Sequence, residues 1–208
     1  MCFMKIKDHI QNEAIGLFFR HGIRSITMDE IASQAGVSKK TIYQWFVDKD
    51  ELVEAVINKE LKKDEQECHQ CRKEAKNAIH ECFLALDMVQ DMLKTMNPLI
   101  IYDLQRYYPR VYKKFKDHKN TFMVNIKKDN LIRGIKEDLY RSDIQADIVA
   151  RAALENVFMG FDPDVFSHNK YSLNVIQQEL FYFFLYGIAS TKGHKMIYEY
   201  RKQRLKNK

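Results

Sequence analysis

The chain has 208 residues, 46% of them hydrophobic, so it is long enough and apolar enough to bury a core. Only 7 glycines and 3 prolines occur, which favours long helices over tightly turned strands. The formal net charge is +6, but residues 192–208 alone hold seven Lys or Arg and one Glu, a surplus equal to the whole excess. Net charge therefore does not place a polyanion site near the N-terminus, and any such site must rest on individual residues.

The sequence shows neither a secretion signal nor a membrane-spanning segment. Residues 1–5 lead directly into a mixed polar pattern rather than an apolar signal-peptide core. The longest apolar run, residues 180–189, is far shorter than the ~20 residues of a spanning helix. The four cysteines do not form the framework of a small secreted domain. We expect a soluble, cytoplasmic protein that does not associate with a membrane.

The first 35 residues predict two helices. Apolar residues recur at helical spacing through residues 5–21, and Gly22 follows them at the position of a C-terminal cap. Thr27 and Glu30 then have the spacing of a capping box, which predicts a second, short helix over residues 28–35.

A third helix is predicted immediately after a glycine turn. Gly36 ends the second helix, and Ser38 is a good N-cap for a helix from Lys39 to Phe46. Two short helices joined by a tight glycine turn are typical of a helix-turn-helix. The residues expected to pack between them are Ile31, Ala32, Val37 and Ile42.

The remaining residues also read as helices. We expect a fourth helix from about residue 50, an apolar helix face over residues 79–93, and a short helix over 99–107. Pro109 then starts a long helix, Gly134 and residues 137–142 form a loop, and two final helices cover about 144–161 and 172–191. The predicted fold is all-α, with a helix-turn-helix domain at 1–50 and a larger helical domain at 51–208.

Residues 14–52 resemble the N-terminal domain of the TetR/AcrR family of bacterial transcriptional regulators. The resemblance rests on Ala14, Phe18, Gly22, Thr27, Ile31, Ala32, Ala35, Gly36, Val37, Ser38, Thr41, Ile42, Tyr43, Phe46, Lys49 and Leu52. It implies that Tyr43 and Lys49 contact DNA phosphates. Trp45 departs from the tyrosine or histidine that often precedes the phenylalanine in that family.

The chemistry of residues 38–46 independently suits DNA, because this segment offers hydrogen-bond donors and cations and contains no acidic residue. Gln44 has the groups for a bidentate pair with adenine, and Lys39 or Lys40 for guanine. The alternative is that this segment is only a packed helix pair. The predicted DNA-binding residues are Thr27, Ser38, Lys39, Lys40, Thr41, Tyr43, Gln44 and Lys49.

Helix-turn-helix proteins normally bind paired half-sites, so we expect a homodimer on a palindromic double-stranded DNA operator. The resemblance implies dimerisation through the last two long helices; the alternative is that their apolar stripes form a monomeric core. The predicted interface residues are Leu154, Val157, Phe158, Phe161, Ile176, Leu180, Phe183, Phe184 and Gly187.

The resemblance also implies a small-molecule effector in the helical C-terminal domain, although aromatic and Met residues at helical spacing are usually ordinary core. The candidates are Phe83, Met92, Tyr102, Tyr107, Phe122, Met123, Asn156 and Phe158.

Two further features leave alternatives open. Cys68 and Cys71 suggest a metal or redox sensor, with lysines nearby to lower a thiol pKa, or else plain cysteines; no metal or cofactor is predicted. The basic segment 192–208 either extends the last helix as a solvated face or makes an auxiliary contact with DNA or a membrane surface.

No arrangement of nucleophile, base or paired carboxylates stands out, so we do not expect an enzyme. The predicted function is a dimeric, sequence-specific transcriptional regulator, a repressor that a small-molecule effector releases from DNA. The alternative is an effector-free architectural DNA-binding protein on the same fold.

Overall fold

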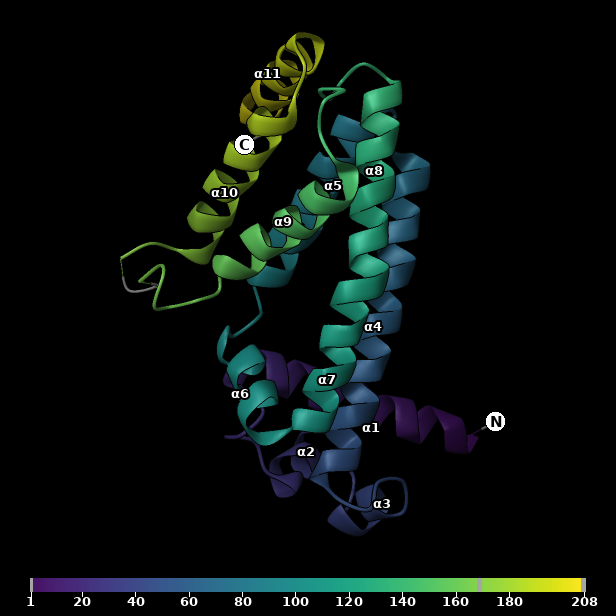
Figure 1. Ribbon diagram of the computed structural model, residues 1–208. Coiled ribbons are helices and arrows are strands. Elements are labelled where there is room, and N and C mark those ends of the chain that lie inside the picture. The colour runs from purple at the N-terminus through teal and green to yellow at the C-terminus, as the bar shows by residue number, and fades with distance from the viewer. Residues whose placement is uncertain (1, 168–169, 207–208) are drawn as a thin grey trace. The chain divides into compact units, whose positions relative to one another are not determined.

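The computed structural model describes residues 2–167 and 170–206 (Figure 1). Over these residues the regular structure is helical, with one isolated bridge between Tyr140 and Ala189, which confirms the all-α prediction. No helix in the described ranges is long and apolar enough to cross a membrane. The chain forms two compact units: the first extends to Asp64 and includes Lys94–Asp117, and the second contains Glu65–Leu93 and the chain from His118 onward.

The first unit contains the helix-turn-helix and the helices that support it. Its elements are α1 (Cys2–His21), α2 (Met28–Gln34), α3 (Lys39–Tyr43), the first part of α4 (Lys49–Glu74), α6 (Leu99–Tyr107) and nearly all of α7 (Pro109–His118). The side chains of Phe18, Ile31, Ile42, Phe46 and Leu52 are at most 1% exposed and form its core. Leu52 is part of this core, and the Asn97 amide donates to the Phe19 carbonyl. The unit therefore extends beyond the boundary at residue 50 that was expected from the sequence.

Helix α3 is shorter than the sequence predicted, because it ends at Tyr43 rather than at Phe46. The Gln44 amide donates to the carbonyls of Lys40 and Thr41, and the Trp45 amide donates to the Ile42 carbonyl at 2.9 Å. The bonds to Thr41 and from Trp45 to Ile42 span three residues and tighten the last turn, while the Phe46 amide still donates to the Ile42 carbonyl at 3.0 Å. The tightened turn directs Phe46 into the core, where it is 1% exposed.

The second unit packs seven helical segments around one apolar cluster. Its elements are the rest of α4, α5 (Ala78–Leu93), the π-helix η1 (Lys119–Met123), α8 (Val124–Lys136), α9 (Ala146–Met159), α10 (Leu173–Ile188) and α11 (Thr191–Lys206). The cluster includes Ile79, Phe83, Leu154, Leu185 and Ile197.

One expectation for residues 109–142 was wrong. The long helix predicted after Pro109 is present: α7, η1 and α8 follow one another without a break, with η1 as a π-helical segment inside the run. Gly134 lies inside α8 rather than in a loop. Glycine is needed there because the Tyr140 ring occupies the space beside it, and a Cβ at Gly134 would lie 2.0 Å from that ring. The amides of Leu139 and Tyr140 both donate to the Gly134 carbonyl, which folds the following turn back over the helix.

The basic C-terminal segment forms a helix of its own and does not extend the preceding one. Helix α10 ends at Ile188, and Ala189 is extended with ψ 144° and bridges to Tyr140. Helix α11 then packs Ile197, which is 0% exposed, into the core. Gly193 approaches so closely that a Cβ there would lie 2.0 Å from the Leu139 carbonyl oxygen. The segment is therefore partly core and not only a solvated face.

Candidate nucleic-acid interface

Helix α2 begins with the capping box that the sequence predicted. The Glu30 amide donates to Thr27 Oγ1 at 3.2 Å, and the Thr27 amide donates to Glu30 Oε2 at 2.7 Å. The Thr27 hydroxyl also bonds to Glu30 Oε2, and the amide and hydroxyl of Thr27 together lower the pKa of this carboxyl. Thr27 is exposed, but a phosphate at this helix start would have to share its donors with a carboxylate.

The turn between α2 and α3 depends on Gly36. Its φ is +63°, in the left-handed region, and its amide donates to the Ser33 carbonyl at 3.2 Å. A Cβ at Gly36 would meet no heavy atom within 4 Å, so the backbone conformation alone requires glycine here. The Val37 amide then bonds to the Ala32 carbonyl at 3.0 Å, which fixes the angle at which the chain enters α3.

Helix α3 has one buried anchor and an otherwise polar surface. Ser38 caps it by accepting from the Thr41 amide at 3.0 Å, and Ile42 is 0% exposed. Thr41 is half-buried, and Tyr43 is 46% exposed. The other predicted contact residues on this segment, Ser38, Lys39, Lys40 and Gln44, are all exposed. The structure thus brings six of the eight predicted DNA-binding residues together on and beside one short helix.

Lys39, the first residue of α3, is held by a neighbouring carboxylate. Its Nζ lies 2.8 Å from Asp29 Oδ2 on α2, and this hydrogen bond raises the pKa of Lys39. Both side chains are exposed, so the pair is solvated and weak. The ammonium is oriented across the surface between α2 and α3.

Lys49, at the start of α4, is directed inward more than its predicted phosphate contact implied. Its Nζ donates to the Ile23 carbonyl at 2.6 Å, with the Arg24 carbonyl 3.5 Å away. The side chain is half-buried, and burial lowers the pKa of Lys49. Lys49 therefore ties the start of α4 to the turn that follows α1.

Sequence reasoning missed the support that α6 gives this turn. Buried Asp103 accepts from the Arg24 amide at 2.9 Å, and the Arg24 guanidinium donates to the Tyr107 hydroxyl at 2.5 Å while lying 4.7 Å from the ring centroid. Gly22, with φ +82°, leaves space for Asp103 Oδ2, which would lie 3.1 Å from a Cβ. The sequence signal for this contact was Asp103 itself, an acidic residue within an otherwise apolar turn of α6.

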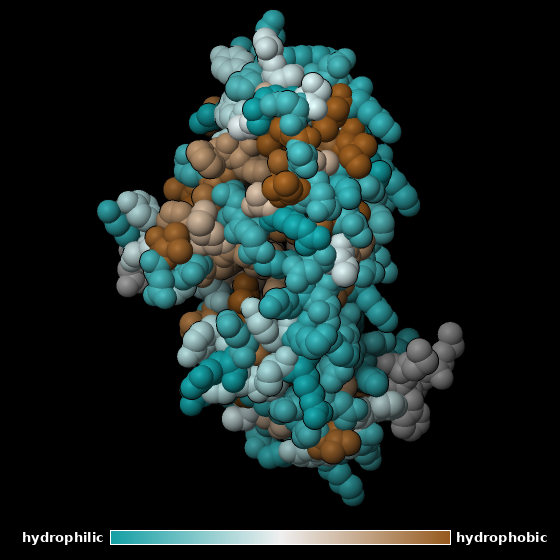
Figure 2. Space-filling model, in the orientation of Figure 1, coloured by the Kyte–Doolittle hydropathy of each residue, from teal (hydrophilic) through white to brown (hydrophobic). Residues whose placement is uncertain are grey.

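The residues predicted for a dimer interface divide into two groups. Leu154 and Ile176 are 2% and 5% exposed, because they pack inside the chain's own core. Phe183 is 78% exposed and Gly187 is exposed, and Figure 2 shows apolar side chains over the region of α10. The half-buried members are Val157, Phe158, Phe161, Leu180 and Phe184.

Two side-chain amides hold α9 and α10 together within the chain. Gln177 Nε2 donates to the Val157 carbonyl at 2.8 Å, and Asn156 Nδ2 donates to the Leu180 carbonyl at 3.0 Å. These two hydrogen bonds hold α9 and α10 against each other beneath the apolar face that both helices expose.

The eight predicted effector residues are divided between the two units. Tyr102 and Tyr107 belong to α6 in the first unit, and Tyr107 is engaged by Arg24. The other six, Phe83, Met92, Phe122, Met123, Asn156 and Phe158, belong to the second unit. Two small cavities of that unit, about 50 and 30 Å³, are lined by other residues.

The three cysteines with described side chains, Cys68, Cys71 and Cys82, form no disulfide. The expectation that nearby lysines lower a thiol pKa is wrong for Cys71: burial raises its pKa, and neighbouring carboxylates act in the same direction. Among the described residues, no three His, Cys, Asp or Glu side chains form a metal site.

Comparison with known proteins agrees with this geometry. Residues 10–56 match the family described as bacterial regulatory proteins, tetR family. A 51-residue stretch is 55% identical to an uncharacterized HTH-type transcriptional regulator of Mycobacterium tuberculosis strain H37Rv, covering 24% of this chain and 21% of that protein. The chain thus matches about a fifth of the length of that relative.

Solved structures resemble the fold over most of the chain. A transcriptional regulator from Cytophaga hutchinsonii superposes with a TM-score of 0.67 at 23% identity, covering 87% of this chain and 97% of that one. FadR from Bacillus subtilis, in complex with stearoyl-CoA, gives a TM-score of 0.68 at 17% identity, covering 86% and 98%. At these identities the likeness establishes the fold.

Proposed function

We propose that the chain is a transcriptional regulator of the TetR family of bacterial regulatory proteins, whose family model residues 10–56 match, and that it binds double-stranded DNA through α2 and α3. The observation that carries the proposal is the composition of the α3 surface. Lys39, Lys40, Tyr43 and Gln44 are exposed on a helix that Ile42 anchors from the opposite side. This arrangement offers donors to base edges and cations to phosphates without using them in the core.

We assign the eight predicted residues two kinds of contact. We assign Gln44, Lys39 and Lys40, which are exposed, to base edges in the major groove. The remaining contacts, to the sugar-phosphate backbone, come from Thr27, Ser38, Thr41, Tyr43 and Lys49. The close bond from Lys49 to the Ile23 carbonyl leaves its remaining N–H groups for a phosphate.

A palindromic operator and a homodimer complete the proposal. One short recognition helix covers too little DNA for useful specificity, so paired half-sites are needed. The exposed apolar face of α10, with Phe183 at its centre, supports dimerisation because a side chain of that size at 78% exposure is costly in water. Operation in the cytoplasm follows from a DNA partner.

We further propose that a small molecule releases the protein from its operator. The support is the fold shared with a regulator solved with stearoyl-CoA. The second candidate is an architectural protein without an effector, which the small size of the two cavities favours. Both readings require the same DNA interface.

The test is fluorescence anisotropy of the purified protein with DNA from upstream of its own gene, at several salt concentrations. We expect saturable binding by two subunits per duplex that weakens steeply with salt, because released counterions drive it. The double variant Lys39→Ala/Tyr43→Phe should bind markedly less. Exposed Lys113, which is paired with Asp117 on α7, provides the control substitution Lys113→Ala with unchanged binding.

Binding that is equally strong to unrelated DNA would support the architectural reading. Equal binding by Lys39→Ala/Tyr43→Phe and the parent protein would exclude α3 as the reading surface.

A further inference from the structure

A small cavity in the second unit is lined by sulfur from two helices. Its volume is about 30 Å³, enough for a single atom or water but not for an organic effector. Helix α4 contributes Cys68 and Cys71, and α5 contributes Cys82 and Met88. Nothing in the proposed DNA interface uses these residues.

Cys71 and Met88 are in contact, and Cys68 lines the same cavity. Cys68 and Cys71 lie three residues apart on α4 and therefore share a helix face. The Cys71 Sγ lies 3.0 Å from the Met88 Sδ, which brings a thiol and a thioether together across the two helices. Such a contact places two soft donors at one end of the cavity.

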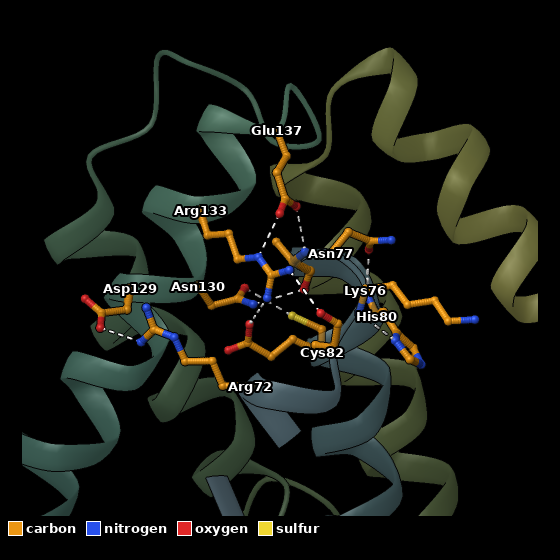
Figure 3. A network of polar contacts seen from close by, with 12 residues as sticks. Arg72, Lys76, Asn77, His80, Cys82, Asp129, Asn130, Arg133 and Glu137 are labelled. Atoms are coloured by element: carbon orange, nitrogen blue, oxygen red, sulfur yellow. Dashed lines mark hydrogen bonds and ion pairs between the residues drawn. The ribbon is translucent and has the colours of Figure 1, made fainter. Parts of the chain in front are cut away.

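The Cys82 thiol already has two polar contacts outside these three residues. Its Sγ lies 3.4 Å from both Asn130 Oδ1 and the Tyr140 hydroxyl, in the buried polar network drawn in Figure 3. Asn130 in turn donates to the Ala78 carbonyl at 3.0 Å. Cys82 thus lines the cavity as part of its wall.

The part of the lining that α8 contributes carries a positive charge. Helix α8 contributes Lys127 to the lining, and Arg72, next to Cys71, is paired with Asp129 of α8 at 2.6 Å (Figure 3). Glu81, the acidic residue of the lining, is already paired with Arg133 at 3.2 Å. Lys127 therefore partly offsets a negative charge formed in this cavity, which burial and the carboxylates around Cys71 oppose.

We propose that Cys68, Cys71 and Met88 bind one Cu(I) ion in this cavity. Thiolate and thioether ligands select soft cations, and carboxylate or imidazole ligands, which hard and borderline cations prefer, are not part of this set. Two thiols lose their protons on binding, and the bis-thiolate Cu(I) centre carries one negative charge, which Lys127 partly offsets. No electron is transferred in this step.

The test is a competition titration of the full chain with Cu(I) under anaerobic, reducing conditions, using bathocuproine disulfonate as the coloured competitor. We expect one Cu(I) per chain and two protons released per ion into a weakly buffered indicator solution. Cys68→Ser and Cys71→Ser should each weaken binding more than about 100-fold, beyond the loss seen for residues that only support a ligand. Met88→Leu should weaken it about 10-fold.

Two matched controls separate the site from general thiol binding. Cys2→Ser removes the fourth cysteine of the sequence, and Met92→Leu changes the exposed methionine one turn beyond Met88 on α5. Both should keep the parent affinity and stoichiometry. Circular dichroism of each variant verifies that it is folded before the titration.

A folded Cys68→Ser/Cys71→Ser double variant that still binds one Cu(I) per chain would overturn the proposal. An equal loss in Cys2→Ser would do the same, as would tight binding of Zn(II) with no binding of Cu(I). Because no DNA is present, the result does not depend on the proposed function.

Discussion

The helix-turn-helix, formed by α2 and α3, and the second unit use their polar side chains in different ways. In the helix-turn-helix, polar groups bond to near neighbours in sequence: Thr27 to Glu30, Ser38 to Thr41, and Lys39 to Asp29 ten residues away. All of these pairs are exposed. In the second unit, Arg133 of α8 donates to Glu81 and to the Ala75 carbonyl, partners more than 50 residues away, in a part-buried setting (Figure 3).

This contrast indicates where an external partner can bind. Exposed local bonds exchange readily with water, so the groups that make them remain available to DNA at low cost. Buried bonds between distant segments stabilise the fold, because leaving any one group unpaired carries a large desolvation cost. The first pattern suits recognition, and the second suits a rigid body.

The largest effect should come from breaking the buried network. Arg133→Met leaves Glu81, which is 6% exposed, without its ion-pair partner. We expect a loss of about 3–5 kcal/mol in the free energy of unfolding, measured by urea denaturation. The double variant Arg133→Met/Glu81→Met should recover most of it, and a loss in the double variant as large as in the single one would show that the pair is not the cause.

Recognition should depend on Gln44 without a comparable change in stability. Gln44 is exposed, so Gln44→Ala should leave the urea midpoint unchanged. It should weaken discrimination at one operator position by about 1–3 kcal/mol, measured by anisotropy against single-base operator variants. A uniform loss at all positions would instead assign Gln44 to the phosphate backbone.

The local cap of α2 should have an intermediate effect on stability. Thr27→Ala removes the acceptor for the Glu30 amide, at a cost of about 1 kcal/mol in the free energy of unfolding. Thr27→Ser keeps the hydroxyl and should remain near the parent value. A cost for Thr27→Ala that matches the Arg133→Met loss would erase the proposed contrast between the helix-turn-helix and the second unit.

The smallest effect at neutral pH should come from Tyr108, between α6 and α7. Burial raises the pKa of Tyr108 to about 12, above its ordinary value of 10.0. Between these values the unfolded chain loses this proton and the folded chain keeps it, so folding stability falls as the pH rises.

Tyr108→Phe should therefore lose less stability than the parent between pH about 10 and 12, with similar urea midpoints at pH 7. Parallel pH profiles for the two proteins would contradict the assignment. Exposed Tyr102 offers the matched substitution Tyr102→Phe, which should follow the parent profile.

The sequence predicted the first unit in detail because its signals are local. Thr27 with Glu30, Gly36 and Ser38 each act within a few residues, and the structure contains the cap, the turn and the second cap that they predicted. The end of α3 was missed by three residues, because burial of Phe46 overrides helix propensity there. The role of Asp103 was missed because its partner, the Arg24 amide, is 79 residues distant.

In the second unit the helices could be predicted, but their neighbours could not. Leu154 and Phe183 both belong to apolar stripes, yet one is 2% and the other 78% exposed. Helical spacing shows that a residue lies on an apolar face but not which neighbour covers that face. The eight effector candidates were selected from helical spacing in the same way, and they are divided between the two units.

The close approach of Tyr140 to Gly134, and of Leu139 to Gly193, restricts the residues that evolution can place there. Any side chain at either glycine would collide at 2.0 Å with a ring or a carbonyl. Two glycines 59 positions apart, with a leucine-tyrosine pair five residues after the first, are therefore required together by this packing.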